Sequence, residues 1–201
     1  MLKRTTGRLL LTLLVVTGLA GTLNNGSLSQ KERKQAINLI KNCKAEINSC
    51  VNHLSHNQLV YKQSAADPSI EDLLISMVAN EIKCSEEIRH YMEKPSESEN
   101  RLKITVTDEQ LFSMNNFPPM IDKENNPALR NANDALRKFN TLRNNQIKYI
   151  RTSTEDLRNH VVSTPSGWVD CYQYNLLLAD RSRLVAEKIN EIKSSPGFPS
   201  K

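Results

Sequence analysis

The chain has 201 residues, which is enough for one folded domain together with a short targeting segment. It is 38% hydrophobic but only 5% aromatic and contains 6 Gly, a composition that disfavours β-sandwiches and β-barrels. The formal net charge of +5 falls to +2 without Lys3, Arg4 and Arg8, which lie in the N-terminal segment. So small a charge offers no electrostatic basis for nucleic-acid binding, and we predict no nucleic-acid partner.

The N-terminus has the parts of a secretory signal. A basic start is followed by an apolar run from Leu9 to Ala20, and then by mostly small or polar residues up to Ser27. The run has ~12 residues, whereas a membrane-spanning helix needs ~20. We therefore predict a signal peptide and short leader over residues 1–28 and an exported protein, periplasmic or secreted. The alternative is an uncleaved segment that keeps the protein at a membrane.

Two amphipathic helices are predicted in the first half of the chain. The first covers residues 30–54, where apolar side chains recur at intervals of three or four, and Ser29 precedes it as a candidate N-cap. The second covers residues 69–92, and Ser69 with Asp72 resembles a capping box.

A long crossover is predicted after the second helix. Residues 96–126 contain Pro118 and Pro119, which cannot belong to a helix interior. A connection of about 30 residues suits a four-helix bundle in which one link spans the length of the bundle.

Two more helices are predicted in the second half. The third covers residues 127–150, with Pro127 in its first turn. The fourth covers residues 169–193, with Asp170 near its start. Between them lie a polar segment and a turn at 164–167. The predicted fold is therefore all-α: one four-helix bundle over residues 29–200, with the long crossover between helices two and three.

Four cysteines leave two interpretations open: Cys43, Cys50, Cys84 and Cys171. An even number permits two disulfides in an oxidising compartment. Cys43 and Cys50 are too far apart along a regular helix to bond each other, and no Cys-x-x-Cys pair suggests zinc. The alternative is that the cysteines are small core residues.

Several short segments carry a family resemblance. The fourth helix and its continuation contain YQYNLLL at 172–178, INEIK at 189–193 and PGFP at 196–199. Earlier segments are ERK at 32–34, LS at 54–55 with QL at 58–59, SI at 69–70, TVTDEQL at 105–111 and DLRNH at 156–160. In this order they resemble an exported branch of the DinB-like (DinB/YfiT) family, over about residues 29–200. The resemblance implies a four-helix bundle with a long crossover, and it allows a homodimer.

The resemblance also implies a metal centre that this chain lacks. Characterised members include metal-dependent thiol transferases and isomerases, and they hold a divalent metal with one His in helix two and two His in helix four. The matching positions here are Ser76, Arg181 and Val185. Serine is a poor ligand, arginine stays protonated and valine has no donor atom. We therefore predict a degenerate site with no metal and no other cofactor.

The four histidines are weak candidates for other chemistry. His53 and His56 lie near the end of the first helix, where two His could bind a metal but are more often exposed, and His90 is expected at the surface. His160 either faces the former metal pocket or packs the loop before the fourth helix.

Arg181 is expected on the inward stripe of the fourth helix. A partly buried guanidinium needs an anionic partner, and Asp72, Glu81, Asp180 or a bound anion could supply it. The candidate pocket therefore consists of Arg181, His160 and Ser76.

Three hypotheses for function follow. The first is a non-catalytic exported bundle that binds a small molecule or a protein partner. The second is a metal-dependent thiol transferase or hydrolase-like enzyme whose ligands have relocated, for example to His160 or to the pair His53 and His56. The third is an interaction module held at a membrane by residues 9–20.

Overall fold

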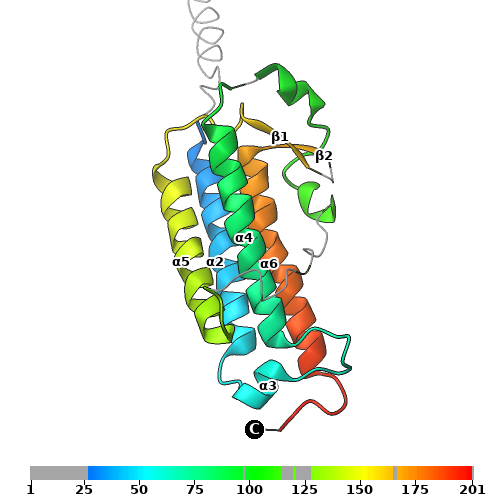
Figure 1. Ribbon diagram of the computed structural model, residues 1–201. Coiled ribbons are helices and arrows are strands. Elements are labelled where there is room, and N and C mark those ends of the chain that lie inside the picture. The colour runs from blue at the N-terminus through cyan, green and yellow to red at the C-terminus, as the bar shows by residue number, and fades with distance from the viewer. Residues whose placement is uncertain (1–26, 97, 115–119, 121–127, 165–166, 201) are drawn as a thin grey trace, which may run out of the picture.

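A computed structural model describes residues 27–96, 98–114, 120, 128–164 and 167–200 (Figure 1). Its long helices are α2 (Gln30–Val51), α4 (Ile70–Met92), α5 (Ala132–Thr152) and α6 (Cys171–Lys193). The shorter elements are α3 (His56–Val60), the 3-10 helices η1 (Ser98–Lys103) and η2 (Leu111–Met114), and the strands β1 (Val161–Thr164) and β2 (Gly167–Asp170). The predicted four-helix bundle is confirmed. Most of the expected leader, up to residue 26, lies outside the described residues.

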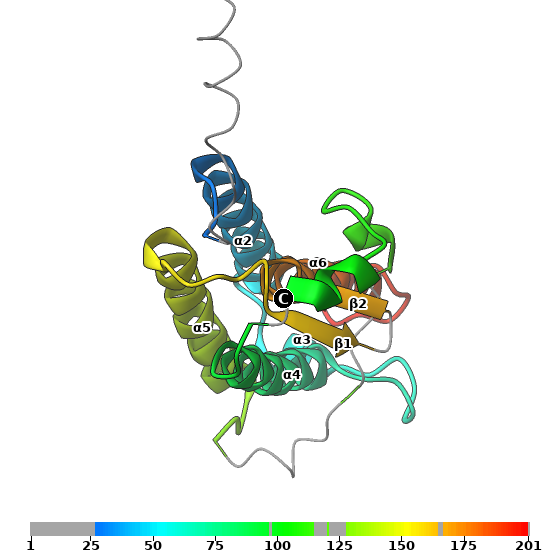
Figure 2. The same ribbon diagram turned by 90° about the horizontal axis from the view of Figure 1, so that it is seen from above.

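The four long helices enclose one core. α2 packs against α5 and α6, and α4 packs against the same two helices, so their order around the bundle is α2, α5, α4, α6 (Figure 2). α2 and α6 run in one direction and α4 and α5 in the other (Figure 1). Because the neighbours α4 and α5 are parallel, the chain must return along the bundle between them, which is the role expected for the crossover.

Side-chain caps determine where the helices begin. Ser29 accepts a hydrogen bond from the backbone of Glu32, and the Glu32 carboxylate accepts one from the Ser29 backbone, so the first capping box is complete. Ser69 and Asp72 form the second, as predicted. A capping box satisfies backbone donors that have no partner inside the helix.

Three helix boundaries differ from those expected. α6 begins at Cys171 rather than at residue 169, because Val169 belongs to β2 and Asp170 is the N-cap. α5 begins at Ala132 rather than at residue 127, because the Asn131 side chain accepts the hydrogen bond of the Asp134 backbone and acts as the N-cap. α2 ends at Val51 rather than at residue 54, and His53 just beyond it has a left-handed φ of 61°. Pro127 lies outside the described residues.

A β-hairpin, not only a turn, precedes α6. β1 and β2 are antiparallel, with Val161 opposite Asp170 and Thr164 opposite Gly167. Val162 and Val169 are buried, and β-branched residues favour an extended backbone that packs one face on the core. The hairpin lies across the start of α6 at one end of the bundle, called here the hairpin end; α3 marks the opposite end (Figure 1).

The core consists of two apolar clusters. One lies toward the hairpin end and includes Ile40, Ile88 and Ile150. The other lies toward the α3 end and includes Phe139 and Val185. A set of buried polar residues on α4, α5 and α6 lies where the two clusters meet. We call this set the polar layer: Asn80, Glu81, Arg143, Asp180 and Ser182. Within the part of the chain that the structure describes, no helix has the length and apolar character to cross a membrane.

Candidate functional site

The three positions of the family metal site lie in or beside a packed core. Ser76 on α4 and Val185 on α6 are 2% and 1% exposed. Arg181, one turn before Val185 on α6, is partly buried and lies against Cys84 of α4. A hydroxyl, a guanidinium and an isopropyl group do not make a donor set for a divalent metal. The residues present therefore do not fit the metal that the resemblance implies.

Arg181 does not have the carboxylate partner that we expected. Its Nη1 lies 3.2 Å from the sulfur of Cys84, and none of the ion pairs among the described residues includes it. Each expected partner is engaged elsewhere: Asp72 with Lys62, Asp180 with Arg183 and Glu81 with Arg143. Arg181 is only half-buried, so water can solvate part of its charge.

The buried guanidinium of this bundle belongs instead to Arg143. Its Nη1 lies 2.9 Å from Oε1 of Glu81, and the two side chains are 1% and 3% exposed. Arg143 Nη2 donates to the Leu178 carbonyl at 2.9 Å and to the Ser182 hydroxyl at 3.2 Å. The pair thus joins α4, α5 and α6 in the polar layer, about one helical turn from the positions that the resemblance matches to metal ligands.

Two atoms of this pair have no hydrogen-bond partner: Oε2 of Glu81 and Nε of Arg143. Both residues line a small cavity of about 10 Å³. Burial raises the pKa of Glu81 to about 7, and the neighbouring Arg143 opposes that rise. Glu81 can therefore exchange a proton near neutral pH.

A groove between α4 and α5 leads toward this pair. Its volume is about 510 Å³, and its apolar walls include Ile88, Met92, Leu142 and Tyr149. Gln146 and Asn175 also line it, and Gln146 donates to the Asn175 carbonyl at 3.1 Å. Because Gln146 also accepts a 2.7 Å hydrogen bond from Arg143, one side chain separates the groove from the buried guanidinium. We call this feature the α4–α5 groove.

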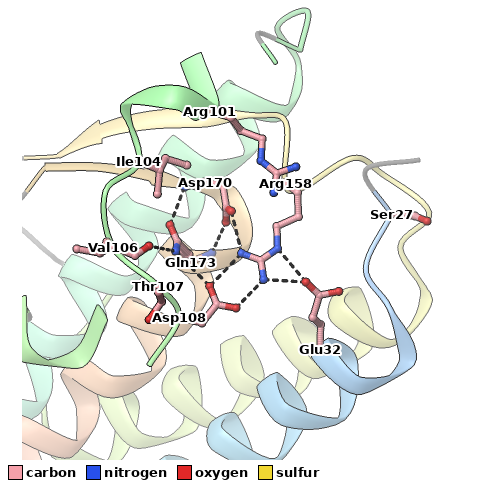
Figure 3. Close-up of a pocket in the computed structure, with 10 residues that line it drawn as sticks. All are labelled: Ser27, Glu32, Arg101, Ile104, Val106, Thr107, Asp108, Arg158, Asp170 and Gln173. Carbon is pink, nitrogen blue, oxygen red and sulfur yellow. Dashed lines mark hydrogen bonds and ion pairs between the residues drawn. The ribbon is translucent and has the colours of Figure 1, made fainter. Parts of the chain in front are cut away.

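A second pocket, of about 300 Å³, lies at the hairpin end around Arg158 (Figure 3). All five N–H groups of Arg158 are engaged by three carboxylates. Nε and Nη2 donate to Glu32 at 3.0 and 2.7 Å, Nη1 and Nη2 to Asp108 at 3.0 and 2.6 Å, and Nη1 to Asp170 at 2.8 Å. One face of the guanidinium also lies 4.2 Å from the Tyr172 ring centroid.

The role of this cluster is structural, and we call Arg158 with Glu32, Asp108 and Asp170 the Arg158 clamp. Glu32 and Asp170 belong to the capping boxes of α2 and α6, whose N-terminal dipoles favour negative charge. Burial by itself would lower the pKa of Arg158, but the three carboxylates raise that pKa above its usual value. A guanidinium with every donor engaged has none left for a ligand, so the cluster holds the crossover to two helix starts.

The candidate pocket of Arg181, His160 and Ser76 is not assembled. The ring nitrogens of His160 lie 2.7 Å from the Asp156 carbonyl and 3.0 Å from the Lys94 carbonyl, at the hairpin end. His160 therefore packs its loop against the end of α4. His53, His56 and His90 are exposed. Across the described ranges, no group of three or more His, Cys, Asp or Glu is arranged to hold a metal ion.

The four cysteines are free and buried in the structure: Cys43, Cys50, Cys84 and Cys171. The two disulfides that the sequence permitted are not formed. The buried positions of the cysteines agree with the other interpretation, in which they are small core residues. Burial raises the pKa of Cys43 and Cys50 to about 11 and that of Cys171 to about 12, which disfavours reactive thiolates.

The segments that carried the family resemblance meet at the two ends of the bundle. Glu32, Asp108, Arg158 and Gln173, each from a different segment, share the Arg158 clamp, where Gln173 donates to Asp108 at 3.1 Å. At the α3 end, Gln58 donates to the Pro199 carbonyl at 2.9 Å. These segments therefore supply contacts that hold the crossover and the C-terminal residues against the bundle.

Comparisons with known proteins agree with this fold. No protein-family model matches the chain, and no curated protein matches it. Among solved structures it is similar to one described as "YfiT from Bacillus subtilis is a probable metal-dependent hydrolase with an unusual four-helix bundle topology". The match has a TM-score of 0.57 and 12% identity, and covers 83% of this chain and 89% of that one. The resemblance to the DinB-like (DinB/YfiT) family is therefore confirmed as a shared fold, the four-helix bundle of YfiT.

Proposed function

We propose that this protein is an exported, non-catalytic bundle that binds a small molecule in the α4–α5 groove. The observation that carries the proposal is the polar layer. An arginine–glutamate pair lies about one turn from the positions that the resemblance matches to metal ligands, where Ser76 and Val185 are packed in the core. An ion pair whose contacts reach α4, α5 and α6 fills this part of the interior, and it offers no open coordination position.

The groove supports the ligand-binding part of the proposal. Small-molecule sites are concave and mostly apolar, with few polar groups in fixed positions and volumes of about 300–1,000 Å³. The α4–α5 groove has about 510 Å³ and apolar walls. Gln146 is held by Arg143 on one side and Asn175 on the other, so its amide is already oriented before a ligand arrives. Export rests on the N-terminal segment.

The alternative is a metal-dependent transferase or hydrolase with relocated ligands, as YfiT is described as a probable metal-dependent hydrolase. It requires ligands outside the family positions. Either function is compatible with a homodimer. Either is also compatible with retention at a membrane through residues 9–20. Both of these stay predictions.

The first test is metal content by elemental mass spectrometry on mature protein purified without an affinity tag or chelator. We expect far less than one metal ion per chain, because the positions of the family ligands hold no suitable donors. A stoichiometric zinc, nickel or iron would contradict the proposal, and His53, His56, His90 and His160 would then be mutated.

The second part of this test is binding of N-phenyl-1-naphthylamine, a neutral fluorescent probe with an apolar body. We expect it to bind the wild-type chain and to lose affinity in Leu142→Trp, which fills the groove. Leu102→Trp, at a side chain that is 90% exposed in η1, is the matched control. No binding by the wild type, or equal binding by both variants, would remove the groove from the proposal.

A further inference from the structure

We propose that the α4–α5 groove takes organic anions with an apolar body, and that protonation of Glu81 strengthens their binding by leaving Arg143 as their buried counter-charge. This inference rests on the function proposed above. It adds a ligand class and a means of regulation.

The contacts form a continuous path from the groove to the ion pair. Gln146 lines the groove and accepts from Arg143 Nη1 at 2.7 Å, and the same Nη1 lies 2.9 Å from Glu81. Gln146 also donates to the Asn175 side chain at 3.2 Å. The cation therefore lies directly beneath the groove, behind one amide that hydrogen-bonds to both sides.

Glu81 is suited to take up a proton. It is 2% exposed, and its Oε2 has no hydrogen-bond partner although it is buried beside a small cavity. Burial raises the pKa of Glu81 to about 7. A proton on this carboxyl removes the charge that is costly to bury, and the hydrogen bonds of Arg143 to Leu178 and Ser182 do not depend on that charge.

The groups around Glu81 do not replace its negative charge. From α5 it faces Arg143, and from α6 Arg181 lines the same cavity. Asp180 on α6 is already paired with Arg183. Cys43 on α2 has its pKa raised by burial to about 11 and stays neutral. With Glu81 protonated, the polar layer therefore carries a buried cation in need of an anion.

Binding and protonation must then promote each other. An anion at the floor of the groove stabilises Arg143 without Glu81, so it makes protonation of Glu81 easier; protonation in turn raises affinity for the anion by the same factor. The walls formed by Ile88, Met92 and Leu142 favour ligands with an apolar body, and Arg89, Glu93 and Glu155 also line the groove. The preference for an anion therefore comes from Arg143 beneath the groove.

The experiment uses 8-anilinonaphthalene-1-sulfonate, whose sulfonate stays ionised throughout, and N-phenyl-1-naphthylamine as the neutral control. We expect the sulfonate to bind about fivefold more tightly at about pH 6 than at about pH 8, with the neutral probe unchanged. Calorimetry at about pH 7 in two buffers of different ionisation enthalpy should show proton uptake with the sulfonate, and this measurement needs no mutation.

Variants locate the effect. Glu81→Gln should bind the sulfonate tightly at both pH values, whereas Glu86→Gln, at an exposed position of α4, should keep the wild-type pH dependence. Circular dichroism checks that both variants fold. Sulfonate binding that is independent of pH, absence of proton uptake, or an unchanged pH dependence in Glu81→Gln would overturn the inference. If the neutral probe binds in any of these cases, the proposed function survives; if neither probe binds, it is the proposed function that fails.

Discussion

At the scale of single residues, Glu81 is a buried acid whose ionisation opposes folding. Its pKa is raised from 4.5 to about 7 by burial, so the folded chain binds a proton more tightly than the unfolded chain does. The stability that this group contributes is therefore fully present below about pH 4.5 and is lost as the pH rises through about 7.

We expect the unfolding free energy to fall between about pH 5 and about pH 7 with a slope of up to ~1.4 kcal/mol per pH unit from Glu81 alone. Glu81→Gln should remove this slope because the amide does not ionise. Urea unfolding at several pH values measures it, with Glu86→Gln as the control. An equal slope in wild type and Glu81→Gln would show that other groups determine the pH dependence.

At the scale of elements, the Arg158 clamp decides how the crossover and the β-hairpin attach to the bundle. Three carboxylates converge on one guanidinium: Glu32 from α2, Asp108 from the crossover and Asp170 from the end of β2. Asp170 is 3% exposed. Removing the guanidinium leaves like charges close together, one of them buried, and that arrangement is costly.

Arg158→Leu should lower the unfolding free energy by about 3 kcal/mol and should loosen the backbone of the β-hairpin. Urea unfolding and amide hydrogen exchange measure the two effects. Arg89→Leu is the matched control, because both members of its ion pair with Glu93 are exposed, and it should cost about 1 kcal/mol or less. Similar decreases in the unfolding free energy of the two variants would show that the Arg158 clamp contributes no more to stability than an exposed ion pair does.

At the scale of the whole molecule, the polar layer lies where the two apolar clusters of the core meet. Buried ion pairs are often no more stable than apolar side chains of similar volume, because both charges must leave water. The layer does join α4 to α5, since Nη1 of Arg143 lies 2.9 Å from Oε1 of Glu81.

Replacing both members, Glu81→Leu with Arg143→Leu, should leave the bundle as stable as the wild type or more stable by about 1–4 kcal/mol. Glu81→Leu should cost about 3–5 kcal/mol, because it leaves the buried Arg143 charge without its partner, whereas Arg143→Leu should cost less because the remaining carboxyl can take up a proton. Thermal and urea unfolding of the four proteins measure the coupling. If the two single losses simply add in the double variant, the ion pair is not a coupled unit.

Much of the fold could be predicted from local sequence. The helices follow from apolar side chains at intervals of three or four, and their starts follow from Ser29, Ser69 and Asp170, whose side chains cap backbone donors that have no partner in the helix. These signals act over a few residues, so they can be read without the rest of the chain.

The site was decided by contacts between distant residues. Arg143 stands four residues from both Phe139 and Ile147, which places it on the inner face of α5, but only the tertiary structure shows that Glu81 is its partner. Arg181 is partly buried, as expected, but only the tertiary structure shows that it contacts Cys84 rather than a carboxylate. The α4–α5 groove likewise exists only because two helices 40 residues apart in the chain run side by side in parallel. Periodicity and capping determine each helix from its own residues, whereas ion pairs, cavities and grooves depend on how the helices pack against one another.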